Sequence, residues 1–166
     1  ELKKYKKKIH SKINKSLNGG QIFFGKELSD FERKFTKKNK SKYGVAVGSG
    51  TDALFIALKS LGIKKGDEVI TAANTAIPTI SAIKITGALP KLVDIGNDYL
   101  IDPLKIEKEI TNKTKVIIPV HLYGQTCEME KIIKIAKKYK LKIVEDCAQS
   151  QGAKYKNRFC GTIGEL

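Results

Sequence analysis

The chain has 166 residues, of which 41% are hydrophobic and 30% are charged, and its formal net charge is +15. This length and balance are typical of about one globular domain and exclude a disordered protein. The longest apolar runs, such as residues 116–120, are far shorter than the roughly 20 residues of a membrane-spanning helix, so a transmembrane protein is excluded as well.

The positive charge would favour nucleic acid or an anionic membrane surface as a partner, because clustered cations release counterions there. Of the 32 basic residues, however, only Arg33 and Arg158 are arginines, and the lysines are scattered along the chain. Proteins that read nucleic acid depend on the planar, bidentate arginine fork. The composition therefore disfavours a nucleic-acid partner and indicates a solvated lysine surface.

The amino-terminal residues contain no apolar stretch of a signal peptide, which predicts a cytoplasmic protein. Cys127, Cys147 and Cys160 form no C-x-x-C pair, and His10 and His121 are the two histidines of the sequence. This pattern predicts reduced structural thiols and no metal site.

Two helices are expected at the start of the chain. Apolar residues spaced by three and four predict the first, which Gly19 and Gly20 end. The run 29–32 has the form of a capping box and predicts the start of the second helix, with Phe31 and Phe35 on one face. We therefore expect residues 1–42 to form a helical segment. The apolar stripe of the first helix comprises Leu2, Tyr5, Ile9, Ile13 and Leu17.

From Tyr43 onward, short β-branched runs alternate with helical patterns. Such alternation is typical of βαβ units, which build a mainly parallel sheet with helices on both faces. The expected fold class is α/β, with residues 43–166 as one domain. In such sheets ligands bind beyond the carboxyl ends of the strands. The expected strands are 44–47, 68–71, 91–94, 115–120 and 142–145, and the expected helices are 52–61, 79–86, 103–110 and 128–139.

The first expected strand is followed by the small residues Gly48, Ser49, Gly50 and Thr51, and a helix begins near Asp52. Small residues let backbone N–H groups approach an anion, and a helix amino terminus offers unpaired donors, so this turn could cradle a phosphate. It is neither a G-x-G-x-x-G motif nor a P-loop, and an ordinary capped turn explains it equally well.

The expected strands at 115–120 and 142–145 are followed by His121 and Asp146. A carboxylate at the end of a buried strand needs a cation or donors, and a protonated pyridinium nitrogen would serve; the alternative is an N-cap for the next turn. His121 could be an acid, a base or a hydrogen-bonded core imidazole.

Taken together, four motifs resemble the DegT/StrS family of pyridoxal-phosphate-dependent sugar aminotransferases. They are the runs 45–54, 66–71, 117–124 and 145–149, and they occur in the family's order over essentially the whole chain. The resemblance implies the large domain of a type I aminotransferase and a homodimer. It also implies transfer of an amino group, usually from glutamate, to a nucleotide-linked keto-sugar, usually in cell-surface polysaccharide synthesis.

The resemblance also implies roles for individual residues. Gly50 and Thr51 would hold the phosphate of pyridoxal 5′-phosphate, in agreement with the cradle described above. Asp146 would pair with the pyridinium nitrogen, so that the ring can act as an electron sink, and Gln149 would hydrogen-bond the phenolic oxygen.

The sequence departs from the family at two places. Ala76 stands where many members carry an aromatic residue that stacks on the cofactor. The Schiff-base lysine of the family follows the equivalent of residues 161–166, so we nominate no catalytic residue in this chain. We expect an amino-terminal portion that is inactive by itself and lacks both the last strands of the large sheet and the small carboxyl-terminal domain.

Three other functions are compatible with the sequence. A sugar dehydratase of the same family would carry histidine in place of the lysine. A non-catalytic basic binding module would use the lysine-rich first helix on nucleic acid or lipid, and would bind heparin or DNA in a salt-dependent way. A catalytically inactive homologue would copurify with an active partner.

Overall fold

In the computed structural model, which describes residues 2–166, the chain divides into two compact units, Glu1–Ala46 and Val47–Leu166. The first unit contains helices α1 (Leu2–Asn18) and α2 (Lys26–Asn39). On α1 the residues of the predicted apolar stripe from Tyr5 to Leu17 are exposed, with Ile9 at 43% and Ile13 at 52%. No helix of the described residues is both long and apolar enough to cross a membrane.

The predicted capping box at the start of α2 is wrong. The helix begins at Lys26, so Ser29 lies inside it and its hydroxyl donates to the carbonyl of Lys26 at 3.1 Å. Glu32 accepts a hydrogen bond from the backbone N–H of Ala46 at 2.8 Å instead of closing the helix start. Ser29 and Glu32 therefore make other contacts than those of a capping box. A hydroxyl within a helix commonly bonds back to a carbonyl of the preceding turn.

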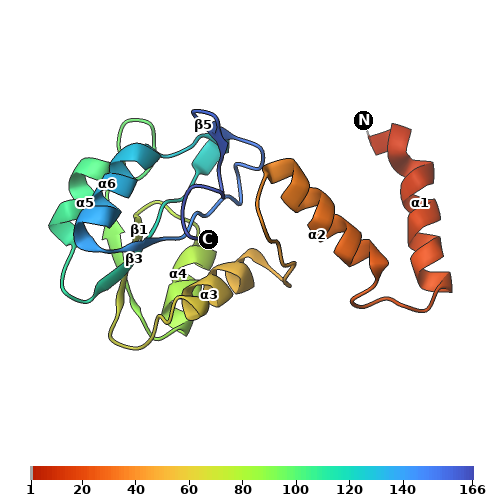
Figure 1. Ribbon diagram of the computed structural model, residues 1–166, viewed down its shortest axis with the longest axis horizontal. Coiled ribbons are helices and arrows are strands. Elements are labelled where there is room, and N and C mark those ends of the chain that lie inside the picture. The colour runs from red at the N-terminus through yellow and green to blue at the C-terminus, as the bar shows by residue number, and fades with distance from the viewer. Residues whose placement is uncertain (1) are drawn as a thin grey trace. The chain divides into compact units, whose positions relative to one another are not determined.

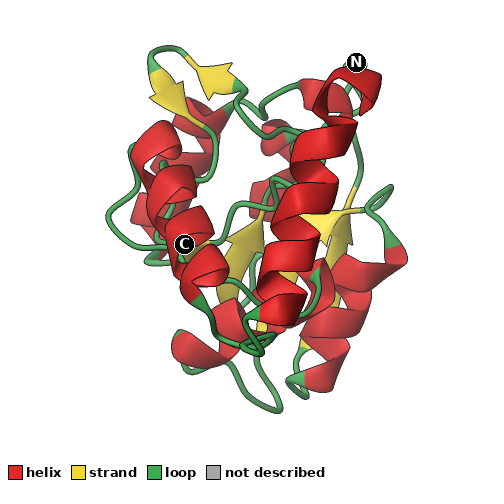
Figure 2. Ribbon diagram, turned by 90° about the vertical axis from the view of Figure 1, so that its right-hand side faces the viewer, coloured by secondary structure: helices red, strands yellow, loops and turns green. Residues whose placement is uncertain are grey.

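The second unit is an α/β structure built on a four-stranded parallel sheet (Figures 1 and 2). The strand order is β2-β1-β3-β4. The strands are β1 (Glu68–Ala72), β2 (Leu89–Val93), β3 (Thr114–Ile118) and β4 (Lys142–Ile143). The helices are α3 (Gly50–Ser60), α4 (Ile77–Ile85), α5 (Pro103–Glu109) and α6 (Met129–Tyr139).

The order of the strands places the helices on both faces of the sheet, as predicted. The chain moves from β1 through α4 to β2, and then in the opposite direction through α5 to β3 and through α6 to β4. Because such crossovers are right-handed, α4 lies on one face and α5 and α6 lie on the other (Figure 1). Helix α3 packs against α4.

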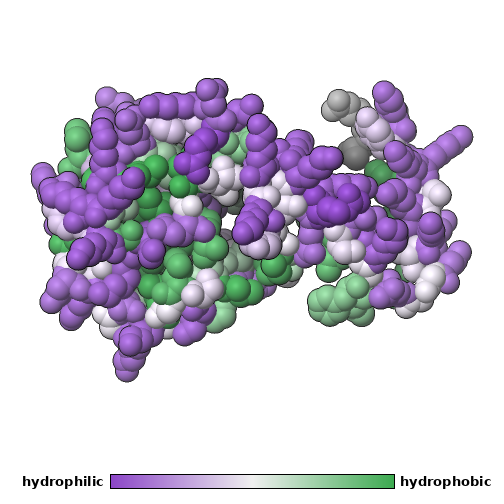
Figure 3. All heavy atoms as spheres, viewed as in Figure 1, coloured by the Kyte–Doolittle hydropathy of each residue, from purple (hydrophilic) through white to green (hydrophobic). Residues whose placement is uncertain are grey.

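The core of this unit consists of aliphatic side chains from the strands and from the inner faces of the helices. Ile70, Ile117 and Ile118 of the sheet are fully buried, as are Leu58 of α3 and Ile132 of α6. The lysines remain outside, and hydrophilic residues cover most of the face seen in Figure 3. This division is the one expected for a single aliphatic core.

Two of the predicted strands differ from the structure. Residues 44–47 form no strand: Val45 is 82% exposed, and Gly44 lies so close to α2 that an added Cβ would meet Thr36 at 2.5 Å. A β-branched run without a pairing partner does not make a strand. The predicted strand 142–145 shortens to β4, but its hydrogen bonds to the segment after β3 continue irregularly as far as Asp146.

Three short elements were not predicted. They are the 3-10 helix η1 (Leu122–Gly124) and the hairpin of β5 (Lys154–Tyr155) with β6 (Arg158–Phe159). Elements of two or three residues are too short to show a hydrophobic period, and this explains why the pattern missed them.

Candidate functional site

The site lies at the carboxyl edge of the sheet, where the chain reverses its direction of winding. The strand that follows β1 in the chain, β2, lies on one side of the central pair of β1 and β3, and the strand that follows β3, β4, lies on the opposite side. The reversal therefore falls between β1 and β3. The hydroxyl of Thr71 donates to the carbonyl of Ile118 at 3.0 Å and ties the two strands there. A reversal of this kind leaves a crevice between the loops that follow the two strands, which is the usual ligand site of open α/β sheets.

Asp146 is held beside this reversal by its backbone. Its N–H donates to the carbonyl of Pro119, and its carbonyl accepts from the N–H of His121, both at 3.0 Å. The carboxylate accepts one hydrogen bond at each oxygen: the N–H of Ala148 donates to Oδ1 at 3.1 Å, and the hydroxyl of Thr79 donates to Oδ2 at 3.0 Å. A carboxylate has about four acceptor positions, so Asp146 keeps room for a further, positively charged donor.

One of the two predicted explanations for Asp146, a cap for the turn that follows, is seen in the structure. The bond from Ala148 is an Asx turn, so the side chain does cap the turn that follows. The bond from Thr79 reaches across the sequence to α4 and is not part of any cap. Asp146 is half-buried, and its carboxylate therefore lies where a ligand can meet it and water is partly excluded.

Gln149 lies in the same loop, and its side-chain carbonyl accepts the backbone N–H of Tyr123 at 3.0 Å. The amide nitrogen keeps its donors for another partner. The ring of Tyr123 meets that of Tyr99 edge to face, with centroids 6.5 Å apart, and Asn74 donates from its side chain to the carbonyl of Tyr99. These contacts join the loops after all four strands, so the carboxyl edge is a connected surface.

Gly50 and Thr51 form the first turn of α3. Ser49 is the N-cap, and its hydroxyl accepts the N–H of Asp52 at 3.1 Å while donating to the Asp52 carboxylate at 2.9 Å. The backbone N–H groups of Gly50 and Thr51 have no acceptor among residues 2–166. Space around Gly50 is open, because an added Cβ would meet nothing within 4 Å. The turn is thus both a capped helix start and a place with two donors left for an anion.

The predicted cofactor residues form two groups. Asp146 and Gln149 share one loop at the carboxyl edge, whereas Gly50 and Thr51 lie at the start of α3. No hydrogen bond within the described part of the chain links the two groups directly. Their connection is through packing, since α3 contacts α4 and α4 carries the threonine that donates to Asp146.

Thr75 and Thr79 belong to this site and were missed by the sequence analysis. The hydroxyl of Thr75 donates to that of Thr79 at 2.9 Å, and Thr79 in turn donates to Asp146. The two threonines flank Ala76, which stands at the position of the family's aromatic residue and is exposed. Two hydroxyls four residues apart at the start of a helix after a strand are the signal that could have found them.

His121 is a core imidazole, the third of the predicted alternatives. It is fully buried, and its Nδ1 accepts the backbone N–H of Cys127 at 3.1 Å. The proton of the neutral ring therefore lies on Nε2, which is 3.0 Å from Oε2 of Glu145. Both ring nitrogens are hydrogen-bonded inside the protein, so neither is free for a ligand.

Glu145 is buried and accepts four hydrogen bonds. Besides His121, the backbone N–H groups of Gly161, Ile163 and Gly164 donate to it at 3.0, 2.6 and 2.7 Å. Burial alone would raise the pKa of Glu145, but the bonds from His121 and the three N–H groups together outweigh it and lower the pKa below the ordinary value. Glu145 is therefore ionised and anchors the last loop to the sheet.

Cys147 lies beside this pair, and single ligand atoms of Cys147, His121 and Glu145 fall within 4.8 Å of one another. Burial raises the pKa of the Cys147 thiol. The nitrogens of His121 are already occupied. Within the cluster, His121 and Glu145 are hydrogen-bonded to each other, and the three cysteines are free thiols.

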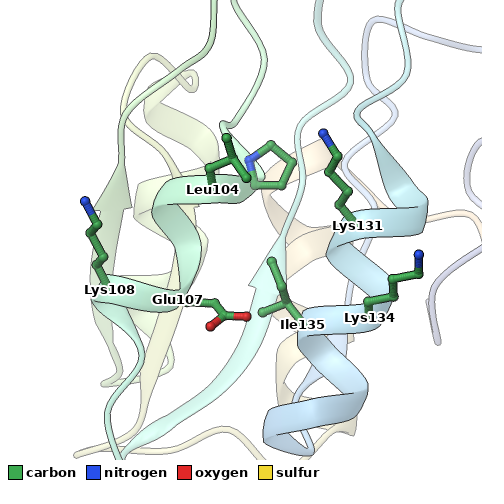
Figure 4. Close-up of a pocket in the computed structure, with 7 residues that line it drawn as sticks. Leu104, Glu107, Lys108, Lys131, Lys134 and Ile135 are labelled. Carbon is green, nitrogen blue, oxygen red and sulfur yellow. The ribbon is translucent and has the colours of Figure 1, made fainter.

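A separate groove lies between α5 and α6 (Figure 4). Leu104 and Ile135 form part of its wall, and Lys108, Lys131 and Lys134 lie along its rim. None of the four predicted cofactor residues lines it, so it is not part of the site at the carboxyl edge.

Comparison with known proteins identifies relatives over nearly the whole chain. Residues 3–166 match the model of the DegT/DnrJ/EryC1/StrS aminotransferase family. A dTDP-3-amino-3,6-dideoxy-alpha-D-galactopyranose transaminase of Aneurinibacillus thermoaerophilus is 48% identical over 98% of this chain and 45% of its own length. GDP-perosamine synthase of Escherichia coli O157:H7 is 46% identical over 86% of this chain and 39% of its own length.

Solved structures have the same fold. DesV of S. venezuelae, in complex with a ketimine intermediate, superposes with a TM-score of 0.94 at 39% identity, over 97% of this chain and 44% of that chain. NtdA of Bacillus subtilis, with bound PMP, superposes with a TM-score of 0.85 at 42% identity, over 87% of this chain and 33% of that chain.

These comparisons confirm the resemblance inferred from the four motifs, and they confirm the α/β aminotransferase fold. The chain spans less than half the length of the relatives described above. On the match of residues 3–166, the chain belongs to the DegT/DnrJ/EryC1/StrS aminotransferase family.

Proposed function

We propose that this chain is the cofactor-binding part of a pyridoxal-phosphate-dependent transaminase. The proposed reaction moves an amino group from glutamate to a nucleotide-linked keto-sugar, in a cytoplasmic homodimer that serves polysaccharide biosynthesis. The relatives named as a dTDP-amino-sugar transaminase and a GDP-perosamine synthase support this substrate class. The observation that carries the proposal is the half-buried Asp146 carboxylate at the reversal of the sheet, with acceptor capacity to spare.

The residues of the site fit the cofactor by their chemistry. Asp146 can accept the N–H of a protonated ring nitrogen, and this charge-assisted hydrogen bond would offset the cost of its partial burial. Gln149 can donate its amide N–H to the phenolic oxygen, since Tyr123 holds the carbonyl end. The free N–H groups of Gly50 and Thr51 can hold the phosphate at the positive end of the α3 dipole.

When bound, the cofactor supplies an electron sink for the transfer of the amino group. This chain would bind and orient the ring and keep its nitrogen protonated through Asp146. We assign no lysine of this chain to the covalent bond with the cofactor.

The test uses pyridoxamine 5′-phosphate, which needs no lysine because it carries an amine in place of the aldehyde. Calorimetric titration of the purified protein should show binding, and Asp146→Ala should weaken it roughly ten- to hundredfold, the value of a charge-assisted hydrogen bond. Asp94→Ala is the matched control, because Asp94 also follows a strand but is exposed and pairs with Lys105. Equal affinities for the wild type and Asp146→Ala would refute the assignment.

A further inference from the structure

We propose that Thr79 is a positioning residue that aims the Asp146 carboxylate at the ring nitrogen of the cofactor. This inference rests on the proposed function and extends it to a residue that does not touch the ring. The carrying observation is the hydrogen bond from the Thr79 hydroxyl to Oδ2 of Asp146, at 3.0 Å, between two residues 67 positions apart in the sequence.

The direction of the hydrogen bonds follows from the chemistry of the groups. An ionised carboxylate only accepts, so the single proton of the Thr79 hydroxyl must point to Asp146. The hydroxyl of Thr75 then has to donate to Thr79, as it does at 2.9 Å. The result is a chain of donors that runs from Thr75 through Thr79 to Asp146 and has one orientation.

The packing of Thr79 makes this donor rigid. Thr79 is 1% exposed and lies in α4, whereas Asp146 is only half-buried in a loop. A β-branched side chain in a helix has few rotamers. Leaving its buried hydroxyl without an acceptor would destabilise the folded protein by about 1 to 3 kcal/mol. Thr79 is therefore the fixed partner, and Asp146 adapts to it.

The two donors to Asp146 act on different oxygens. Ala148 belongs to the same loop as Asp146 and holds Oδ1, so it moves with that loop. Thr79 holds Oδ2 and joins the loop to α4, which follows β1 on the other side of the reversal. Fixing both oxygens sets the plane of the carboxylate, and with it the directions of the remaining acceptor positions.

The experiment compares two ligands that differ at one atom. Pyridoxamine 5′-phosphate has a ring nitrogen, and its 1-deaza analogue has C–H at that position, so the ratio of their dissociation constants reports the contribution of the Asp146 contact. Both are titrated calorimetrically into the purified wild type, Thr79→Val and Thr79→Ser. We expect the wild type to prefer the nitrogen ligand by roughly tenfold or more.

Thr79→Val should weaken binding of the nitrogen ligand severalfold and leave the affinity for the deaza analogue unchanged. Thr79→Ser, which restores the hydroxyl, should restore the preference. Thr86→Val is the matched control, because Thr86 is a buried threonine at the other end of α4 that bonds only to nearby backbone. It should leave the ratio at the wild-type value.

Three results would overturn the inference. Thr79→Val could weaken the binding of both ligands equally, which would indicate a general structural defect, or it could leave both affinities unchanged. A wild type that does not distinguish the ligands would refute the Asp146 contact of the proposed function itself. Should Thr79→Val fail to fold, Thr79→Cys, with a similar volume and a weak donor, gives the same comparison and has the same expected loss of preference.

Discussion

Glu145 and Asp146 are neighbours in sequence, yet their carboxylates have opposite surroundings. Glu145 is buried and accepts four hydrogen bonds, from His121 and from three backbone N–H groups of the last loop. Asp146 is half-buried and accepts two. Both residues lie in the segment after β4 that still hydrogen-bonds to the residues after β3. Adjacent side chains of such a paired segment point to opposite sides, so one carboxylate enters the core and the other reaches the carboxyl edge.

The two carboxylates differ in how much of their hydrogen-bonding capacity the protein itself uses. All the acceptor positions of Glu145 are occupied within the protein, so nothing is left for a ligand. Asp146 is oriented by its two donors but not saturated. We therefore expect changes at Glu145 to appear as loss of stability, and changes at Asp146 to appear as loss of cofactor binding.

The largest effect is expected for Glu145→Gln. The substitution keeps the shape but turns one carboxylate oxygen into an N–H₂ group, which would face the donors of the last loop or of His121. The free energy of unfolding should fall by about 3 kcal/mol, as expected when one member of a buried charged network is lost. Urea unfolding followed by circular dichroism measures this, and an unchanged midpoint would contradict the structural role of Glu145.

The stabilisation by the Glu145 carboxylate should depend on pH. The pKa of Glu145 is lower in the folded protein than in the unfolded chain, so the stabilisation is present above the unfolded pKa, about 4.3 for glutamate. It is lost as the pH falls from there through the lower, folded pKa. The wild type should lose stability in this acidic range, and Glu145→Gln should lose less. Urea unfolding of both proteins between pH 3 and pH 6 measures this. If the free energy of unfolding fell equally with pH in both, other carboxylates would dominate the loss of stability in acid.

Asp146→Asn should have a much smaller effect on stability, below about 1 kcal/mol, because the side chain is half-buried and an amide can still accept one of the two hydrogen bonds. The same urea unfolding experiment measures it beside Glu145→Gln. If Asp146→Asn lowered the free energy of unfolding as much as Glu145→Gln, Asp146 would also be a structural carboxylate, and the proposed distinction between the two residues would be wrong.

Much of the fold could be predicted from the sequence because long elements carry a clear period. The helices at 103–110 and 128–139 were predicted to within a residue or two, since their apolar spacing and the Pro103 start are local signals. The strand at 44–47 was wrong, since whether a short run pairs depends on partners that lie far away in the sequence.

The candidate site could be predicted only in part, for the same reason. Asp146 and Gln149 lie in a motif that the family resemblance marks, and their place after a strand indicates the carboxyl edge. The contact between Thr79 and Asp146 joins residues 67 positions apart, and so does not show in any local pattern. The donors of Glu145 likewise come from a loop without periodic residues.

The smallest effect on stability is expected for Gln149→Ala. Gln149 is exposed, and among residues 2–166 its side chain makes one hydrogen bond, from the N–H of Tyr123, which water can satisfy in its place. The free energy of unfolding should change by about 0.5 kcal/mol or less, while the affinity for pyridoxamine 5′-phosphate should fall severalfold, since a donor to the phenolic oxygen is lost. Because Gln149 and Glu145 lie four residues apart in one segment, a stability loss without a loss of affinity would place Gln149 with the structural group and remove it from the proposed site.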